Sequence, residues 1–445
     1  MTRPLCPYVG LQPFTETERG YFFGREREIR LITANMRVAP LTVLYGHSGV
    51  GKSSVLRAGV IPALQARAQT AVVYVIDWRS DQSLDALKLA CAEAVAALPG
   101  GAGVPSAAAS DLPLDVLLLM LSDRGRFELF IVLDQFEDWL TYRPAETVAT
   151  TFDEELARVI NRRDPHIAML LAVRADALFR LDRYRTRIPR LLENSLRLRH
   201  LSAEAAERAI RQPLAVHNAH NNVPIAIDDA VVDAVIGDAT AAEFRLGEHM
   251  ERSVDPSAAR VVEAPLLQLV MTRLWDVEVG AGSTTLRLET YERLGRSVQI
   301  AESHLDHSLT ALPEPEQALC ADMFQWLVTP SGHKIAQTLR DLSAYSGRPE
   351  PDVSNLLAKL GDARILRALP PVLDARGERY ERFHDVLASG VLSWRHRFLA
   401  AQQSERVRRW TGFIAPVLRR SSAWWHWALP SASSAKCTSG PSGTS

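Results

Sequence analysis

The chain of 445 residues has few cysteines, no excess of charge and no long apolar run. Its four cysteines are too scattered for a disulfide framework or a metal knuckle, which favours a reducing cytoplasm. Lys and Arg total 51 against 52 Asp and Glu, so overall charge draws the chain to neither nucleic acid nor an anionic membrane. No stretch of about 18 apolar residues occurs, and the N-terminus lacks the apolar core of a signal peptide. We therefore expect neither a membrane span nor secretion.

The chain does contain a complete phosphate-binding pattern, G-x-x-x-x-G-K-[ST]. The positions that fill it, with the serine that follows, are Gly46, His47, Ser48, Gly49, Val50, Gly51, Lys52, Ser53 and Ser54. An apolar run precedes the pattern and helical spacing follows it, which disfavours the alternative of a glycine-rich turn with an accidental lysine. Backbone N–H groups would converge on the phosphates, Lys52 would reach the β- and γ-phosphates, and Ser53 would bind Mg²⁺. The sequence therefore predicts a site for ATP or ADP with Mg²⁺.

Strand-like and helix-like runs alternate before residue 203, as in an α/β fold with a parallel sheet and helices on both faces. The five expected strands span 41–45, 71–76, 128–134, 167–173 and 195–201. From residue 203 on, helical periodicity dominates. Further along the chain, three expected helices followed by a two-strand ribbon indicate a winged helix. These helices span 316–328, 334–345 and 351–360, and the ribbon spans 364–369 and 380–383.

We therefore predict four segments. They are a P-loop NTPase domain over 1–202, a helical domain over 203–312, a winged-helix domain over 313–400 and a disordered tail over 401–445. The tail is rich in Ser, Pro and Trp, a composition that suggests a truncated or frameshifted end.

Acidic residues follow a second apolar strand. Asp134 ends that strand, where ligands of open α/β sheets collect, and its buried charge is costly without a cation, so we assign it to Mg²⁺. Hydrolysis also needs a group that orients water, for which Glu137 is the first candidate and Asp138 the second. The alternative is that Asp134 caps the next helix and the other two form its acidic first turn. Arg174 is a candidate for stabilising the γ-phosphate, or else for a salt bridge to Asp176 or Glu137.

Several motifs, taken in order, resemble those of the signal-transduction ATPases with numerous domains, the STAND class. Within that class the chain is similar to the novel STAND NTPases of bacterial multidomain proteins. The motifs span residues 7–14, 21–26, 133–137, 173–176 and 265–269, together with the phosphate-binding pattern 46–53, which is called the P-loop below.

The resemblance implies further site residues. Phe23, Gly24 and Arg25 would line the adenine pocket, although the residues alone indicate only a turn and the start of a helix. Pro213 would pack near the base, without the glycine that usually precedes that proline. His384 would touch the β-phosphate of ADP in a closed state, whereas a helix cap or a core histidine is the alternative.

The resemblance also implies a function in signalling or defence. The chain would be a slowly hydrolysing ATPase switch, closed with ADP, and open and self-associating with ATP. No effector or sensor domain is recognisable, so we expect an unidentified partner protein. One alternative is a nucleotide-gated DNA-binding regulator, which the single basic residue in 351–360 disfavours. Another alternative is a nucleotide-binding scaffold that never hydrolyses.

Overall fold

The computed structural model describes residues 6–78, 82–101, 106–122, 125–143, 151–245, 261–328, 336–369, 379–382 and 390–405. The chain forms two units, Met1–Leu392 and Ser393–Ser445. In the second unit the described residues are helical up to 405, so the predicted disordered tail is wrong for 401–405, and its remainder lies outside the described residues. Every element named below belongs to the first unit.

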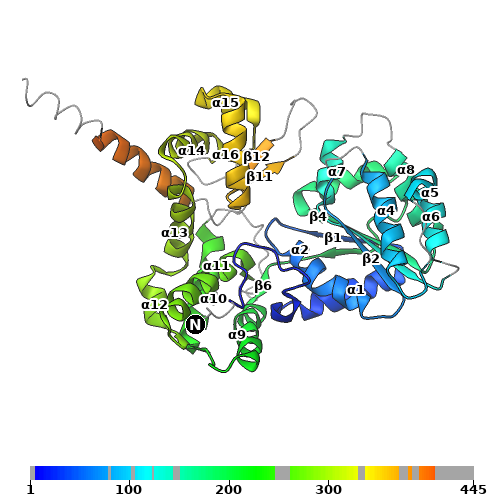
Figure 1. Ribbon diagram of the computed structural model, residues 1–445, viewed down its shortest axis with the longest axis horizontal. Helices are drawn as coiled ribbons and strands as arrows, with labels where there is room; N and C mark the ends of the chain where they lie inside the picture. The colour runs from blue at the N-terminus through cyan, green and yellow to red at the C-terminus, as the bar shows by residue number, and fades with distance from the viewer. Residues whose placement is uncertain are drawn as a thin grey trace, which may run out of the picture. The chain divides into compact units, whose positions relative to one another are not determined.

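A five-stranded parallel sheet organises the first part of the chain (Figure 1). The strand order is β2-β3-β4-β1-β5, and all neighbours pair in parallel, as predicted. The strands are β1 (Leu41–Gly46), β2 (Thr70–Val75), β3 (Glu128–Leu133), β4 (Ile167–Arg174) and β5 (Ser195–Arg197).

The fifth strand is shorter than expected. It pairs with β1 up to Tyr45, whose carbonyl also accepts the Leu198 N–H at 2.8 Å, and the last residue of β1, Gly46, begins the P-loop. Of the residues predicted to continue it, 198–200 form no strand, and Leu201 begins β6 (Leu201–Ser202), which pairs antiparallel with β8 (Val261–Val262).

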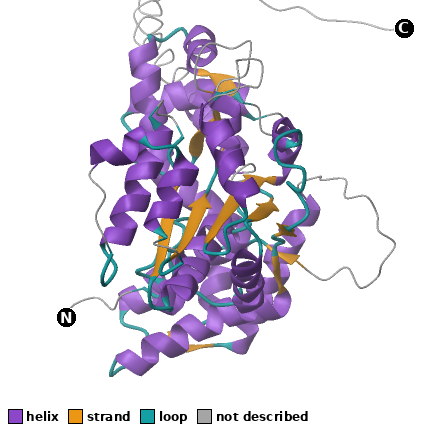
Figure 2. Cartoon of the chain, turned by 90° about the vertical axis from the view of Figure 1, so that its right-hand side faces the viewer, coloured by secondary structure: helices purple, strands orange, loops and turns teal. Residues whose placement is uncertain are grey.

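Helices lie on both sides of the parallel sheet (Figure 2), and side chains that point to its opposite faces are buried in two separate cores. In β3, Ile131 and Leu133 join the core of one face, whereas Phe130 and Val132 join that of the other. The first face is covered by α4 (Ser83–Ala96), α5 (Ser106–Asp111), α6 (Leu114–Leu121), α7 (Phe136–Tyr142), α8 (Thr151–Arg162) and the 3-10 helix η3 (Ala175–Tyr184). The second face is covered by α1 (Glu26–Val38) and the helix that follows the P-loop.

The helix after the P-loop is not regular. It runs as α2 (Lys52–Ser54), the π-helix η2 (Val55–Val60) and α3 (Ile61–Gln65). Pro62 in α3 has no N–H to donate to the carbonyl of Ala58, and this missing bond accounts for the wider turn before it. Such π turns are frequent at functional sites.

The next region is helical, as predicted, and short strand pairs join its helices. Its core includes Trp275 and Tyr291, both fully buried. The helices are α9 (Ala203–His220), α10 (Asp229–Arg245), α11 (Ala264–Glu278), the 3-10 helix η4 (Val279–Ala281), α12 (Leu288–Arg293) and α13 (Arg296–Thr310), and β7 (Ala226–Ile227) pairs in parallel with β9 (Thr285–Leu286).

Three helices and a small antiparallel sheet follow. They are α14 (Glu314–Leu327), α15 (Leu339–Ser346), α16 (Glu350–Asp362) and strands in the order β10 (Gln337–Thr338), β12 (Arg379–Arg382), β11 (Leu366–Leu369). The expected helices and ribbon are present, and β10 is an additional strand. The winged-helix assignment and the domain boundaries stay predictions.

An ion pair at the end of α11 makes the stability of the helical region depend on pH. Arg287 donates to the Glu278 carboxylate at 2.6 and 3.1 Å, and these bonds lower the pKa of Glu278 to about 2. Because the ordinary pKa is 4.5, this stabilisation is complete above that pH and is lost as the pH falls toward 2. We expect Glu278→Gln to lower the urea midpoint at about pH 7 and to lie closer to the parent at about pH 3. The same difference at both pH values would contradict this expectation.

Candidate functional site

Most of the predicted site residues line one pocket of about 470 Å³. It lies where β1, β2, β3 and β4 end at their carboxyl edge, the usual ligand position in an open α/β sheet. The predicted residues that line it are Phe23, Arg25, Ser48, Gly49, Val50, Gly51, Lys52, Ser53, Ser54, Asp134, Glu137, Asp138 and Arg174.

The P-loop has the backbone that its glycines allow. Gly49 and Gly51 have φ of +76° and +94°, a region that other residues rarely adopt. Lys52 is only 9% exposed, and its Nζ donates to the carbonyl oxygens of Gly46 at 2.9 Å and His47 at 3.2 Å. Gly46 and His47 themselves do not line the pocket. The ammonium group therefore lies over the loop that would hold the phosphates.

Asp134 is fully buried and forms no ion pair among the described residues. Its Oδ2 accepts a hydrogen bond from the Tyr74 hydroxyl and its Oδ1 accepts one from the Gln135 N–H, both at 2.8 Å. Gln135, and not Asp134, is the residue that precedes α7, so Asp134 does not cap this helix, whereas Glu137 and Asp138 do form its acidic first turn, as the alternative expected.

The donor set at this point fits a hard cation. The carboxylate of Asp134 and the hydroxyl of Ser53 belong to the same pocket, and Mg²⁺ prefers oxygen ligands. Within the described ranges no three His, Cys, Asp or Glu side chains gather into a metal site. Where Mg²⁺ binds with a nucleotide, one or two protein ligands are usual, and phosphates and water supply the others.

Glu137 lies in the first turn of α7, facing the end of β4. Its Oε2 accepts the backbone N–H of Arg174 at 3.2 Å. Burial raises the pKa of Glu137, and the charge of Lys52 opposes that shift. A raised pKa suits a carboxylate that takes a proton from water. Asp138, the second candidate, also lines the pocket.

Arg174 lines the pocket and also forms the ion pair that was its alternative role. Its Nε and Nη2 donate to the two carboxylate oxygens of Asp176 at 2.9 and 2.7 Å. Asp176 is largely exposed, so the guanidinium can leave it at small cost.

Two variants separate these roles. We expect Arg174→Ala to slow single-turnover hydrolysis about tenfold or more, because it removes charge stabilisation of the transferred phosphoryl group. Asp176→Asn should keep the parental rate, since the guanidinium remains. Hydrolysis rates measured with a limiting amount of ATP distinguish the two roles. An equal loss of rate in both variants would indicate that Arg174 acts through its ion pair with Asp176 and not on the phosphate.

The segment before α1 forms another wall of the pocket. Phe23 and Arg25 line it, and Arg25, which is 3% exposed, donates to the Val50 carbonyl at 2.9 Å and so supports the P-loop. Gly24 does not line the pocket. Its φ is +87°, and a Cβ atom there would lie 2.4 Å from the carbonyl oxygen of Ala205, so this glycine permits close approach to α9.

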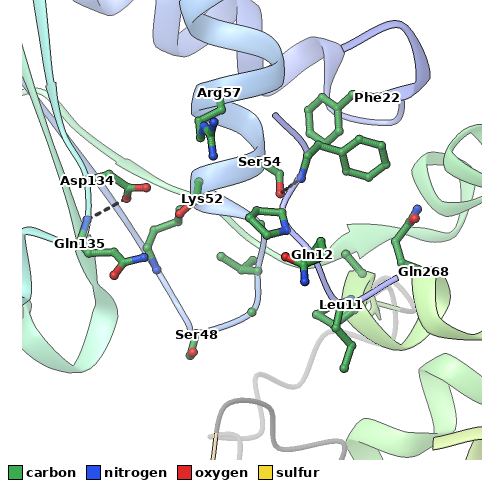
Figure 3. A pocket seen from close by; sticks show the side chains of 18 of the residues that line it. Leu11, Gln12, Phe22, Ser48, Lys52, Ser54, Arg57, Asp134, Gln135 and Gln268 are labelled. Atoms are coloured by element: carbon green, nitrogen blue, oxygen red, sulfur yellow. Dashed lines mark hydrogen bonds between the residues drawn. The ribbon is translucent and has the colours of Figure 1, made fainter. Parts of the chain in front are cut away.

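Other pocket residues were not predicted as site residues. Figure 3 shows Leu11, Gln12 and Gln268 on the opposite side of the pocket from Lys52 and Asp134. In the sequence their segments stand out only as the family-like motifs 7–14 and 265–269, and those motifs are the signal from which these residues can be identified. The two segments are in contact, since Gln268 Oε1 accepts the Val9 N–H at 3.2 Å.

A family model described as Novel STAND NTPase 1 matches residues 7–409. The chain belongs to this family. The match confirms the resemblance inferred from the motifs, and it makes the chain a nucleotide-binding NTPase of the STAND class. No curated protein matches the sequence.

Besides Gly24, a second residue that the family resemblance implied, Pro213, is not among the described residues that line the pocket of this STAND NTPase. Pro213 is buried inside α9, which reaches the pocket through Ala209, and α11 contributes Pro265. The role of Pro213 stays a prediction. His384 lies outside the described residues.

Solved structures with a similar fold share little sequence with this STAND NTPase. ORC1 of Aeropyrum pernix, solved in complex with DNA, is 17% identical with a TM-score of 0.43, over 86% of this chain and 94% of that chain. ORC2 of the same organism, solved in ADPNP–ADP complexes, is 15% identical with a TM-score of 0.43, over 85% and 95%. The Walker-type ATPase paby2304 of Pyrococcus abyssi is 15% identical with a TM-score of 0.43, over 86% and 98%.

Proposed function

We propose that this STAND NTPase is an ATP-dependent switch, closed with ADP, and open and self-associating with ATP. The main support for the proposal is that residues from three regions of the chain line the same pocket. Lys52 and Asp134 come from the sheet region, Gln268 from α11 in the helical region, and Arg364 from the turn between α16 and β11. A nucleotide in this pocket would contact all three regions. Its phosphates could therefore change how these regions bind one another, because a ligand shifts an equilibrium by its differential affinity.

The two sides of the pocket suit different parts of a nucleotide. Phe14 and Phe22, whose ring centroids are 5.1 Å apart, line the pocket together with Leu11 and offer apolar surface to a base. Lys52 and Arg174 offer positive charge to the phosphates.

The proposed chemistry is phosphoanhydride hydrolysis without a covalent intermediate. Ser53 and Asp134 would hold Mg²⁺, which supplies charge neutralisation at the phosphates when bound. Glu137 would orient the attacking water and accept its proton, with Asp138 as the second candidate. Positioning and charge account for the rate in this scheme.

DNA binding through α16 has little support in the charges of that helix. Lys359 is its one basic residue, and its Nζ pairs with the Glu316 carboxylate at 2.7 and 2.9 Å. Glu350 and Asp352 place two acidic groups in the first turn. A nucleic-acid interface needs several cations directed at phosphates.

A membrane partner also lacks support. Of the helices in the described ranges, none combines the length and apolar character that crossing a bilayer requires. We propose a cytoplasmic location, which the few and scattered cysteines support, and an unidentified effector or sensor protein as the partner.

The retained nucleotide and its turnover test the proposed function. We expect ADP to be released from the purified protein by acid, and added ATP to be converted slowly to ADP and phosphate. Lys52→Ala, purified in the same way, should retain little nucleotide. ATP retained without conversion would favour the scaffold that never hydrolyses, and the absence of any nucleotide or turnover would contradict the proposal.

A further inference from the structure

Strand geometry places a tyrosine beside the proposed metal-binding carboxylate. β2 pairs with β3 in parallel, with Tyr74 opposite Val132. Because side chains alternate between faces, Asp134 continues the face of Val132, and Tyr74 projects from the same face. The backbone ladder also continues past the end of β3, since the Asp134 N–H donates to the Val75 carbonyl at 2.8 Å. This register brings the two side chains together at the sheet edge under α2.

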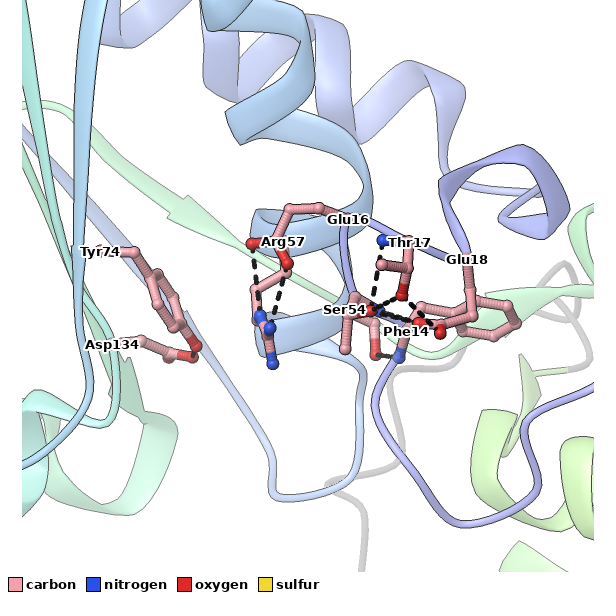
Figure 4. Close-up of polar contacts among 9 residues, drawn as sticks. Phe14, Glu16, Thr17, Glu18, Ser54, Arg57, Tyr74 and Asp134 are labelled. Atoms are coloured by element: carbon pink, nitrogen blue, oxygen red, sulfur yellow. Dashed lines mark hydrogen bonds and ion pairs between the residues drawn. The ribbon is translucent and has the colours of Figure 1, made fainter. Parts of the chain in front are cut away.

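The tyrosine makes a direct hydrogen bond to the carboxylate. The Tyr74 hydroxyl donates to Asp134 Oδ2 at 2.8 Å (Figure 4). An ionised carboxylate can only accept hydrogen bonds, so the Tyr74 hydroxyl is the donor in this contact. Because Gln135 N–H binds the other oxygen, both carboxylate oxygens have a fixed direction.

A second layer of contacts holds the tyrosine ring. The guanidinium carbon of Arg57 lies 5.6 Å from the Tyr74 ring centroid. Arg57 in turn donates to the carboxylate of Glu16 at 3.0 and 3.4 Å. Glu16 belongs to the N-terminal segment, which also binds the P-loop helix through the Phe14 N–H and Ser54 Oγ at 3.2 Å. The chain of contacts therefore runs from the N-terminal segment to Asp134.

We propose that Tyr74 is a positioning residue for the metal-binding carboxylate, and that Arg57 and Glu16 hold it in place. The terminal torsion of an aspartate is broad, so an unsupported carboxylate turns among many orientations. With Oδ2 held by Tyr74 and Oδ1 by the Gln135 N–H, the carboxylate keeps one orientation, and its remaining lone pairs are held in fixed directions for a cation. Partners of metal ligands commonly change metal affinity about tenfold to a hundredfold. The inference rests on the proposed assignment of Mg²⁺ to Asp134.

The test is a Mg²⁺ titration of the nucleotide complex of the whole chain, with Mn²⁺ as a spectroscopic probe of the same site. Tyr74→Phe keeps the ring and removes the hydroxyl, and we expect Mg²⁺ to bind about tenfold more weakly. Nucleotide affinity measured in EDTA should stay at the parental value. Glu16→Gln should shift the Mg²⁺ midpoint in the same direction by a smaller factor. Tyr45→Phe is the matched control, because Tyr45 lies on β1 and does not line the pocket.

The outcomes separate this inference from the proposed function. A weaker Mg²⁺ midpoint in Tyr74→Phe, with parental nucleotide affinity in EDTA, supports it. A parental or tighter midpoint in Tyr74→Phe overturns it, and if Asp134→Asn has lost Mg²⁺ dependence in the same experiment, the proposed metal site stands. Parental Mg²⁺ dependence in Asp134→Asn overturns both the metal assignment and the positioning role.

Discussion

Lys52→Ala is expected to bind ATP and ADP at least about tenfold more weakly than the parent, a loss of about 1.4 kcal/mol or more. Lys52 is the one lysine among the described residues that line the pocket, and a charge-assisted contact to a phosphate is stronger than a neutral one. Its present acceptors, the carbonyl oxygens of Gly46 and His47, lie on the loop itself, so the ammonium is already close to where phosphates would bind. Titration with a fluorescent ATP analogue measures the loss.

A matched lysine provides the control for this prediction. Lys359→Ala removes an ammonium from an ion pair on α16, away from the pocket lining, and should leave nucleotide affinity unchanged. A folded Lys52→Ala protein with parental affinity would remove the phosphate-binding assignment of the loop.

Asp134→Asn and Glu137→Gln are expected to lose different properties, Mg²⁺-dependent binding in the first and hydrolysis in the second. Asp134→Asn should lose the Mg²⁺ dependence of nucleotide binding, because an amide oxygen is a weaker ligand for a hard cation than a carboxylate. Glu137→Gln should bind the nucleotide with Mg²⁺ as the parent does, yet hydrolyse it about a hundredfold more slowly, since a positioned base contributes on that order. Single-turnover hydrolysis and nucleotide titration, each with and without Mg²⁺, separate the two effects.

The pH dependence of turnover and a third variant test whether Glu137, and not Asp138, is the base. Burial raises the pKa of Glu137 above 4.5, so the deprotonated base and the turnover should be lost as the pH falls through that raised value. This loss should be missing from the residual activity of Glu137→Gln. If Asp138→Asn is inactive while Glu137→Gln keeps the parental rate, Asp138 is the base and the preference for Glu137 is wrong.

The sequence was sufficient for the parts of the site that are local in the chain. The P-loop pattern, the strand before it and the acid after β3 each lie within a few residues, where strand periodicity and glycine spacing carry the signal. Asp134 is buried at the end of β3, as predicted from its place after an apolar strand. The family match then confirmed the class that the ordered motifs indicated.

Contacts between distant segments could not be read from local patterns. Gln268 meets Val9 across 259 positions, and Tyr74 meets Asp134 across 60, and neither separation leaves a periodicity in the sequence. The early end of β5 likewise depends on where its partner β1 turns into the P-loop. For Arg174 the residues allowed two roles, and only the three-dimensional geometry shows the ion pair with Asp176.

Light scattering of the purified chain in two nucleotide states tests the central claim most directly. With ADP and Mg²⁺ we expect the mass of the closed form, and with a slowly hydrolysed ATP analogue and Mg²⁺ we expect larger assemblies. Lys52→Ala should keep the smaller mass in both states, because it lacks the phosphate contact. The same mass for the parent with ADP and with the ATP analogue, when both are shown to be bound, would contradict the switch.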